Sequence, residues 1–293
     1  GRCTGAPITS SSGSLARYRL RPVVVAMIPL SLKIEHRLLS QSAFGASFVS
    51  VGTSRNDRQQ KFLASPRRRV SPAAAALEPF DFSSRRGWDD FYHRRGEKSE
   101  DDEGGEAFEY EWHPSIPHSS IISELEPGCS CLMLGCGNSA LPADLYDAHG
   151  GRTRVYSLDY SSVCVEAMRE LHGSDRPGMS FVCADALKLD ETDISGLCGD
   201  AESDAFDVVV DKGLVDALMC GEAWDYDVSR LFRGVSEVLR KDGGLYILVS
   251  FKLAQSTKDF LQEEGGRHGF KWDFDINSKS NNGVSFSIGR RRA

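Results

Sequence analysis

From about Ser119 onward, short apolar runs alternate with segments whose apolar residues recur every three or four positions. The runs predict buried strands at residues 130–134, 155–159, 179–185, 206–211 and 245–251. The clearest of the intervening segments predicts an amphipathic helix on Val228, Leu231, Phe232, Val235 and Val238. Strands that alternate with helices in this way are typical of a parallel sheet with helices wound over both faces.

The last part of the chain follows a different pattern. Residues 271–276 and 284–288 alternate apolar and polar positions across an Asn/Ser/Gly segment, which predicts an antiparallel hairpin. A plain dinucleotide-binding fold lacks such an ending. The predicted fold class is therefore α/β: a Rossmann-like, seven-stranded, mostly parallel sheet with a C-terminal antiparallel hairpin and helices on both faces.

Two further helices are predicted from local patterns. Trp88, Phe91 and Tyr92 fall on one face of a short helix, at positions i, i+3 and i+4. After the strand at 155–159, Ser162 is expected to cap a helix. Its expected apolar face consists of Cys164, Ala167, Met168 and Leu171.

The stretch from Cys129 to Ser139 is the main candidate for a ligand-binding site in this chain. Its strand breaks into a tight turn at residues 135–137, and a helix is expected to begin near Ser139. A glycine-rich turn lets a ligand approach bare backbone, and the helix N-terminus adds unpaired N–H donors. Gly135, Gly137 and Ala140 also satisfy G-x-G-x-x-A, although an ordinary β–α turn can match that pattern by chance. The stretch predicts a nucleotide-type pocket.

Acidic residues end several of the predicted strands. Asp159 lies 24 residues after Gly135, where an acid accepts hydrogen bonds from ribose hydroxyls in Rossmann-like folds. Asp185 and Asp211 end two other strands, and ligands of open α/β sheets bind outside these carboxyl ends. A phosphate would not need so many acids. The set suits a neutral adenosine that carries a cationic sulfonium, which is S-adenosyl-L-methionine.

Five blocks of sequence, in order, resemble the seven-strand methyltransferases that modify lysines of elongation factor 1-alpha. The resemblance spans about residues 87 to 250 and rests on residues 88–92, 108–112, 134–141, 158–163 and 206–217. It implies a protein-lysine N-methyltransferase that uses S-adenosyl-L-methionine and transfers the methyl group in line to an elongation factor 1-alpha-like substrate. Because the sulfonium already activates the methyl group, neither a metal nor a covalent nucleophile is required.

The resemblance also implies roles for individual residues. Gly135 would lie under the methionine part of the cofactor, and Gly137 would also bind the cofactor. Asp159 would bind the ribose, while Asp211 would orient the acceptor. The adenine would lie against Tyr160, Asp185 and Ala186. The residues expected to complete the cofactor pocket are Trp88, Tyr92, Trp112 and Lys212, with aromatic faces that attract a sulfonium.

The sequence departs from the family in three places. Leu214-Val215 replaces the usual Thr-Leu, an acidic loop at 97–106 is longer, and an N-terminal extension precedes the domain. The extension raises a second possibility, an organellar protein-lysine methyltransferase of the citrate synthase type. Three further classes of protein fit the same nucleotide-type pocket: a small-molecule methyltransferase, a cofactor-binding protein without turnover and a nicotinamide dehydrogenase.

Charge divides the chain. The net charge of −7 combines +9 over residues 1–80 with −16 over the rest. We interpret 1–80 as a targeting or disordered extension, 81–120 as a cofactor lid with an acidic loop, and 121–293 as the methyltransferase domain. A targeting segment would direct the protein to a plastid or mitochondrion, and without one it would be cytoplasmic. Alternatively, the extension has no targeting function.

The charge pattern also bears on partners. The acidic domain suits a basic protein partner and argues against nucleic acid. The apolar run at 23–32 is shorter than a membrane span requires.

Cysteines and histidines show no metal-binding spacing. None of the eight cysteines forms a C-x-x-C pair, and no pair of histidines completes a zinc set. The cysteines are expected to be small core residues. His93, His113, His118 and His268 are expected at the surface.

Overall fold

The computed structural model describes residues 80–96, 108–192, 205–276 and 283–292. All of them belong to one compact unit that begins at residue 65. The predicted targeting segment, the acidic loop at 97–106 and the turn of the C-terminal hairpin lie outside the described residues.

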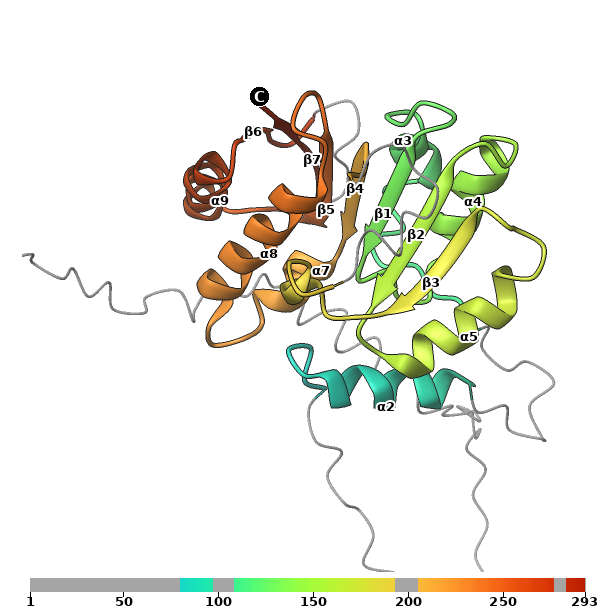
Figure 1. Cartoon of the computed structure of the whole chain (residues 1–293). Helices are drawn as coiled ribbons and strands as arrows, with labels where there is room; N and C mark the ends of the chain where they lie inside the picture. The colour runs from blue at the N-terminus through green and yellow to red at the C-terminus, as the bar shows by residue number, and fades with distance from the viewer. Residues whose placement is uncertain (1–79, 97–107, 193–204, 277–282, 293) are drawn as a thin grey trace, which may run out of the picture. The chain divides into compact units, whose positions relative to one another are not determined.

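A seven-stranded sheet forms the centre of this unit (Figure 1). Its strands lie in the order β3-β2-β1-β4-β5-β7-β6, with β1 to β5 parallel and β7 antiparallel to both β5 and β6. The predicted fold class is therefore confirmed. The strands span Ser130–Leu134 (β1), Arg154–Asp159 (β2), Met179–Cys183 (β3), Val208–Lys212 (β4), Leu245–Phe251 (β5), Phe270–Asp273 (β6) and Val284–Arg291 (β7).

Several predicted strand boundaries were wrong. In the C-terminal hairpin, β6 ends at Asp273 instead of residue 276, and β7 continues to Arg291 instead of ending at residue 288. The third strand ends at Cys183, because Asp185 instead caps the short 3-10 helix η2 (Ala186–Lys188) by accepting a hydrogen bond from Leu187 N at 2.9 Å. The fourth strand begins at Val208, since Phe206 pairs with Leu239 in an isolated bridge outside the sheet.

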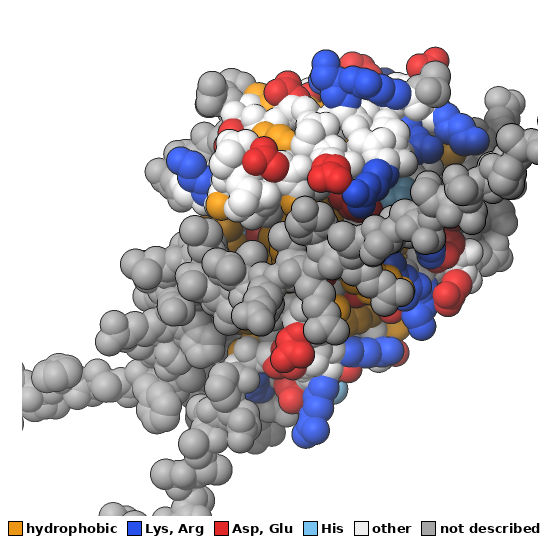
Figure 2. All heavy atoms as spheres, turned by 90° about the vertical axis from the view of Figure 1, so that its left-hand side faces the viewer, with side chains coloured by type: hydrophobic (Ala, Val, Ile, Leu, Met, Phe, Trp, Pro, Cys, Tyr) orange, Lys and Arg blue, Asp and Glu red, His pale blue; other side chains and the backbone are white. Residues whose placement is uncertain are grey.

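Helices cover both faces of the sheet. The described helices are α2 (Arg85–Gly96), α3 (His118–Ile122), α4 (Leu141–Ala148), α5 (Ser162–His172), α7 (Leu214–Leu218), α8 (Trp224–Val238) and α9 (Gln255–Arg267). Helix α8 buries Val228, Leu231, Phe232 and Val235, as its spacing predicts. Its outer side carries Arg233, which pairs with Asp190 at 2.7 Å. Figure 2 shows the left-hand side of Figure 1 face on, where acidic and basic side chains are intermixed over the described part of the surface.

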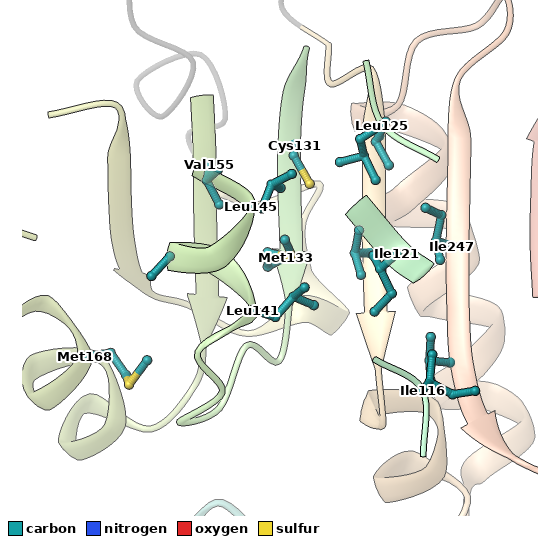
Figure 3. Close-up of a cluster of buried hydrophobic side chains, with 14 of the residues drawn as sticks. Ile116, Ile121, Leu125, Cys131, Met133, Leu141, Leu145, Val155, Met168 and Ile247 are labelled. Atoms are coloured by element: carbon teal, nitrogen blue, oxygen red, sulfur yellow. The ribbon is translucent and has the colours of Figure 1, made fainter. Parts of the chain in front are cut away.

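Successive residues of the central strands belong to two separate hydrophobic cores, because side chains alternate between the faces of a sheet. Cys131 and Met133 of β1 pack with α3, α4 and α5, and Figure 3 shows Leu141 and Leu145 of α4 beside them. Leu132 and Leu134 point the other way, into the core under α8 and α9. Strands buried on both faces read as continuous apolar runs, and this is why the sequence reveals them.

Helix α2 lies across the carboxyl edge of the sheet, beside α5 (Figure 1). Its buried residues are Phe91 and Tyr92, which join a cluster of aromatic rings with Phe80, Trp88 and Trp112. The helix predicted from Trp88, Phe91 and Tyr92 is confirmed. It covers the edge at which a ligand of this fold binds.

Two details of helix α5 were predicted wrongly. Its N-cap is Ser161, whose Oγ accepts a hydrogen bond from Cys164 N at 3.4 Å, so Ser162 is the first helical residue. Leu171 is 51% exposed and does not belong to the buried face. That face consists of Cys164, Val165 and Met168.

None of the helices in the described ranges is both long enough and apolar enough to span a membrane.

Candidate active site

The glycine turn after β1 takes the predicted form. Gly135 and Gly137 both have φ of +54°, a left-handed conformation that costs side-chain-bearing residues free energy. Cys136 N donates to Leu158 O at 2.9 Å, which ties the turn to β2. A Cβ atom on Gly135 would lie 3.2 Å from Leu214 Cβ, so α7 packs directly against the bare backbone.

Asp159 joins this turn to the end of β2. Its carboxylate accepts hydrogen bonds from Gly137 N and Ser161 N, both at 3.0 Å. Burial raises its pKa to about 6, although the two backbone donors oppose this shift. A carboxylate offers about four acceptor positions, so lone pairs remain for the hydroxyl groups of a ribose.

The predicted adenine side comes together around Tyr160. Burial is the main cause that raises the pKa of its phenol, and the charges of Asp159, Asp89 and Asp185 add to the shift. Ala186 is buried at the start of η2, next to Asp185. The structure thus brings the ends of β2 and β3 together as predicted.

Three predicted aromatic residues form one cluster over the same edge. Trp88 stacks on Tyr92 with ring centroids 5.9 Å apart, and Trp112 meets Trp88 edge-on at 5.7 Å. A Cβ on Gly137 would lie 3.2 Å from Tyr92 Oη, so this ring covers the glycine turn. Ser161 Oγ donates to Asp89 of α2, a second link between the helix and the strand ends.

A pocket opens beside the glycine turn, on the face of the sheet that carries α4. Its lining includes Gly135, Cys136, Ser139, Val210 and Lys212. The side chain of Lys212 is only 7% exposed, which excludes a solvated loop lysine. Burial lowers the pKa of its ammonium, and the charge of Glu111 opposes this shift.

Glu111 occupies the centre of a polar network at this pocket. Its carboxylate accepts from Lys212 Nζ at 2.7 Å, Ser139 Oγ at 2.8 Å and Ala140 N at 2.9 Å. His118 lies 3.0 Å from the same carboxylate and 2.6 Å from that of Asp144. Burial alone would raise the pKa of Glu111, but hydrogen bonds from His118 and Lys212 outweigh it and lower the pKa to about 2.

Asp211 lies on the opposite face of β4 from Lys212, because neighbouring strand residues alternate. Its side chain is fully buried. It accepts hydrogen bonds from Leu214 N at 2.9 Å, Val215 N at 3.3 Å and Tyr246 Oη at 3.1 Å. Asp211 therefore holds the β4–α7 turn, and its direct contact with an acceptor stays a prediction.

His113 and Asp216 form a pair next to the same turn. His113 Nε2 donates to Asp216 Oδ2 at 2.8 Å, and its ring meets Phe251 edge-on at 4.6 Å. The prediction of a surface histidine was wrong here, because His113 is 4% exposed. His118 is also largely covered, at 17% side-chain exposure.

Within the described ranges, no group of His, Cys, Asp and Glu has the geometry of a metal site. Cys164 is buried and Cys136 is half-buried, and burial raises the pKa of both thiols. Buried neutral thiols pack as small apolar groups and are poor nucleophiles.

Comparison with known proteins decides the family. The family model described as "Methyltransferase domain" matches residues 125–266. EEF1A lysine methyltransferase 4 of Bos taurus is 32% identical over 188 residues, which cover 58% of this chain and 69% of that protein. The chain belongs to the seven-strand methyltransferases. S-adenosylmethionine is the methyl donor of this family, which agrees with the predicted cofactor, and the predicted resemblance is confirmed.

Other relatives of this methyltransferase are longer. The eEF1A lysine and N-terminal methyltransferase of Homo sapiens is 30% identical over 182 residues, covering 61% of this chain. Its homolog in Drosophila melanogaster is 30% identical over 185 residues. The chain spans 23% and 24% of their lengths, about a quarter of each. Among solved structures, phosphoethanolamine N-methyltransferase 2 of Haemonchus contortus covers 72% of this chain and 58% of its own at 12% identity, with a TM-score of 0.44.

The residues of this methyltransferase that its sequence did not single out are Asp89, Glu111, His113, His118, Ser161 and Asp216. Glu111 and Asp216 both lie inside blocks that carried the family resemblance, so the blocks themselves were the available signal. His113 left no signal, because its carboxylate partner Asp216 is 103 residues away. His118 lies seven residues after Glu111 and 26 before Asp144 in the chain, and no periodic pattern links it to either carboxylate.

Proposed function

We propose that this chain transfers a methyl group from S-adenosyl-L-methionine to a lysine side chain of a protein, with an elongation factor 1A-like acceptor. The observation that carries the proposal is the Asp159 carboxylate, held between Gly137 N and Ser161 N. It lies at the carboxyl ends of β1 and β2, beside the switch point between β1 and β4, where the order of the strands reverses and ligands of such folds bind.

The described residues fit the proposed cofactor. The left-handed residues of the turn, Gly135 and Gly137, carry no side chains, and the spare lone pairs of Asp159 suit ribose hydroxyls. Tyr160, Asp185 and Ala186 are proposed to hold the adenine, with Gly135 and Lys212 on the methionine side. The cluster of Trp88, Tyr92 and Trp112 keeps water away and favours a cation near its ring faces.

The acceptor must arrive as a neutral amine. When bound, S-adenosylmethionine supplies a methyl group already activated on a sulfonium, so the chain has only to bind, orient and exclude water. A lysine ammonium, with an ordinary pKa of about 10.4, must first release a proton to solvent. Apolar and aromatic walls help, because they destabilise the charged form.

The identity of the acceptor is proposed from the names of the relatives and from the charge of the chain. Two of the relatives are named as methyltransferases of eEF1A lysines. The net charge of −7 suits a basic protein partner. The predicted organellar destination of residues 1–80 is a separate proposal, and it would bring citrate synthase within reach as acceptor.

The test is transfer of labelled methyl groups by the full chain to purified elongation factor 1A, purified citrate synthase and a metabolite extract, in parallel. We expect label on a lysine of elongation factor 1A, lost in the Asp159→Ala variant. Label found only on citrate synthase or only on metabolites would show that the proposed acceptor is wrong. Turnover that survives Asp159→Ala would contradict the proposed cofactor site.

A further inference from the structure

The geometry points to Asp216, held by His113, as the carboxylate that orients the acceptor amine. This inference rests on the proposed function and deepens it. It concerns the side of the crevice opposite the adenosine, where the sequence pattern singled out Asp211 instead.

The position of the acceptor side follows from the order of the strands. The proposed ribose and adenine residues end β2 and β3, on one side of β1, while β4 and β5 lie on the other. A methyl group at the end of a cofactor bound across β1 therefore faces the residues that follow β4 and β5. These residues include Gly213 in the β4–α7 turn, Asp216 in the first turn of α7, and Phe251 at the end of β5.

Two carboxylates lie in this region, and their surroundings differ. Asp211 has no exposed surface, and Leu214 N, Val215 N and Tyr246 Oη already donate to it. The side chain of Asp216 keeps 11% of its surface exposed. Its described donors are His113 Nε2 and Phe251 N, so acceptor positions remain on both oxygens. Asp216 can therefore meet an incoming ammonium, whereas Asp211 would first have to give up its partners.

His113 is held in a costly arrangement to make this pair. Its φ is +58°, a conformation that is uncommon outside glycine. Nδ1 of the same ring is buried and has no hydrogen-bond partner among the described residues. Backbone strain and unpaired buried polar atoms gather where a structure is selected for activity rather than for stability. Both occur at this one residue.

The remaining contacts show what His113 fixes. The hydrogen bond from Nε2 to the Asp216 carboxylate fixes the orientation of the ring. Nε2 would lie 3.6 Å from a Cβ on Gly213, which places the ring directly against the turn. Trp112, the preceding residue, accepts from Lys212 Nζ at 2.6 Å through its carbonyl. Consecutive residues thus hold the cofactor side through Lys212 and the acceptor side through Asp216.

With this arrangement the Asp216 carboxylate accepts a hydrogen bond from an N–H of the acceptor lysine, before and after that nitrogen loses its proton to solvent. The bond fixes the direction of the nitrogen lone pair toward the methyl group. His113 is a positioning residue, which acts through Asp216 and does not itself touch the acceptor.

The experiment compares the full chain with its His113→Phe and Asp216→Asn variants. Cofactor affinity is measured by calorimetry, and kcat and KM are measured for methyl transfer to purified elongation factor 1A. His113→Phe keeps an aromatic ring against Phe251 but removes the bond to Asp216. The matched control is His268→Phe, which removes a histidine 3.5 Å from Glu264 on α9, away from the crevice.

We expect both variants to lower kcat/KM for the acceptor by about 10- to 100-fold, as misplacement of a reacting group does. The dissociation constant for S-adenosylmethionine should stay within about twofold of the parent value, and His268→Phe should leave both quantities unchanged. A purely structural role would instead weaken cofactor binding together with turnover, and that outcome would overturn the inference. Wild-type turnover in either variant would overturn it as well.

The cofactor measurement separates this inference from the proposed function. A parent chain that binds no S-adenosylmethionine, or that binds it and labels no lysine of the acceptor, would overturn the proposed function and the pair with it. A parent chain that does both, with variants of unchanged kcat/KM, would overturn only the assignment of Asp216 and His113.

Discussion

Single buried carboxylates set how the stability of this chain depends on pH. Burial raises the pKa of Asp211 to about 7, above its ordinary 3.8. Between about pH 4 and 7 the folded chain thus holds a proton that the unfolded chain has released. The free energy of unfolding should fall as the pH rises through this window, and Asp159, with a pKa of about 6, contributes in the same direction.

We predict that Asp211→Asn makes this decline shallower, because the amide cannot ionise. Urea denaturation of parent and variant at several pH values from 4.5 to 7.5 measures the effect. The pKa of Glu111 is shifted in the opposite direction, so Glu111 changes the free energy of unfolding with the opposite sign and over a lower pH range. Its pKa is lowered to about 2, so its contribution is present above about pH 4.5 and is lost as the pH falls toward 2. An Asp211→Asn variant whose stability falls as steeply as that of the parent would contradict the assigned burial.

Gly135 offers a second prediction for a single residue. An alanine there would adopt φ of +54° and place its Cβ 3.2 Å from Leu214 Cβ. We expect Gly135→Ala to lower the free energy of unfolding by about 1–3 kcal/mol, the usual cost of such backbone strain, and to weaken cofactor binding. The matched control is Gly266→Ala in helix α9, where a Cβ meets nothing within 4 Å.

The control should gain stability, by about 0.5–1 kcal/mol, since alanine is the better helix former. Both variants are compared by thermal unfolding. Equal behaviour of the two would show that the turn tolerates a side chain.

At the scale of single residues, the sequence predicted those residues whose roles depend on their neighbours along the chain. The conformation of Gly135 follows from a strand that must turn, and Asp159 from its place at a strand end. His113 could not be found in this way, because its role depends on Asp216, a residue 103 positions away. Lys212 was found only through a family block, and its partner Glu111, 101 positions away, was not singled out.

At the scale of elements, burial on both faces made the central strands easy to predict. Helix α9 was missed because its sequence is mostly polar and contains Gly265 and Gly266, which are poor helix formers. It forms because Leu261 and Gly265 pack inward, the latter against Trp272. Helix α7 has only five residues, too few for a periodic pattern to show.

Helix α2 should behave as a separate cover. Its ties to the rest of the chain are mainly aromatic, and Trp88 contacts the rings of Phe80, Phe82, Phe91, Tyr92 and Trp112. We predict that Trp88→Ala increases amide hydrogen exchange in residues 85–96 by at least tenfold and leaves β1 to β5 protected. Local opening of a weakly docked element is the physical reason.

Hydrogen exchange followed by mass spectrometry measures this directly. Leu171→Ala is the matched control, because that side chain is 51% exposed on α5 and should change neither region. Loss of protection throughout the sheet would mean that α2 folds as part of the core.

At the scale of the whole molecule, the sheet separates two tasks. Under the proposed function, the ends of β1, β2 and β3 form the cofactor side, and the segments after β4 and β5 form the acceptor side. The segment from Glu111 to His113 contacts both, through Lys212 and Asp216. The family blocks predicted cofactor residues at the ends of strands and an acceptor role for Asp211. They did not predict the segment that joins the two sides, because its contacts exist only after the chain folds.

The most direct test of the central claim is calorimetric titration of the full chain with S-adenosyl-L-methionine and, separately, with NAD. The account predicts micromolar affinity for S-adenosyl-L-methionine and none for NAD. Asp159→Ala should weaken the binding by at least tenfold, through loss of the ribose contacts and of the turn's anchor at Gly137. Asp147→Ala, which removes an exposed ion pair with Arg176, should bind as the parent does. Binding of NAD alone, or equal affinity in Asp159→Ala, would contradict the assignment of this crevice as a methyl-donor site.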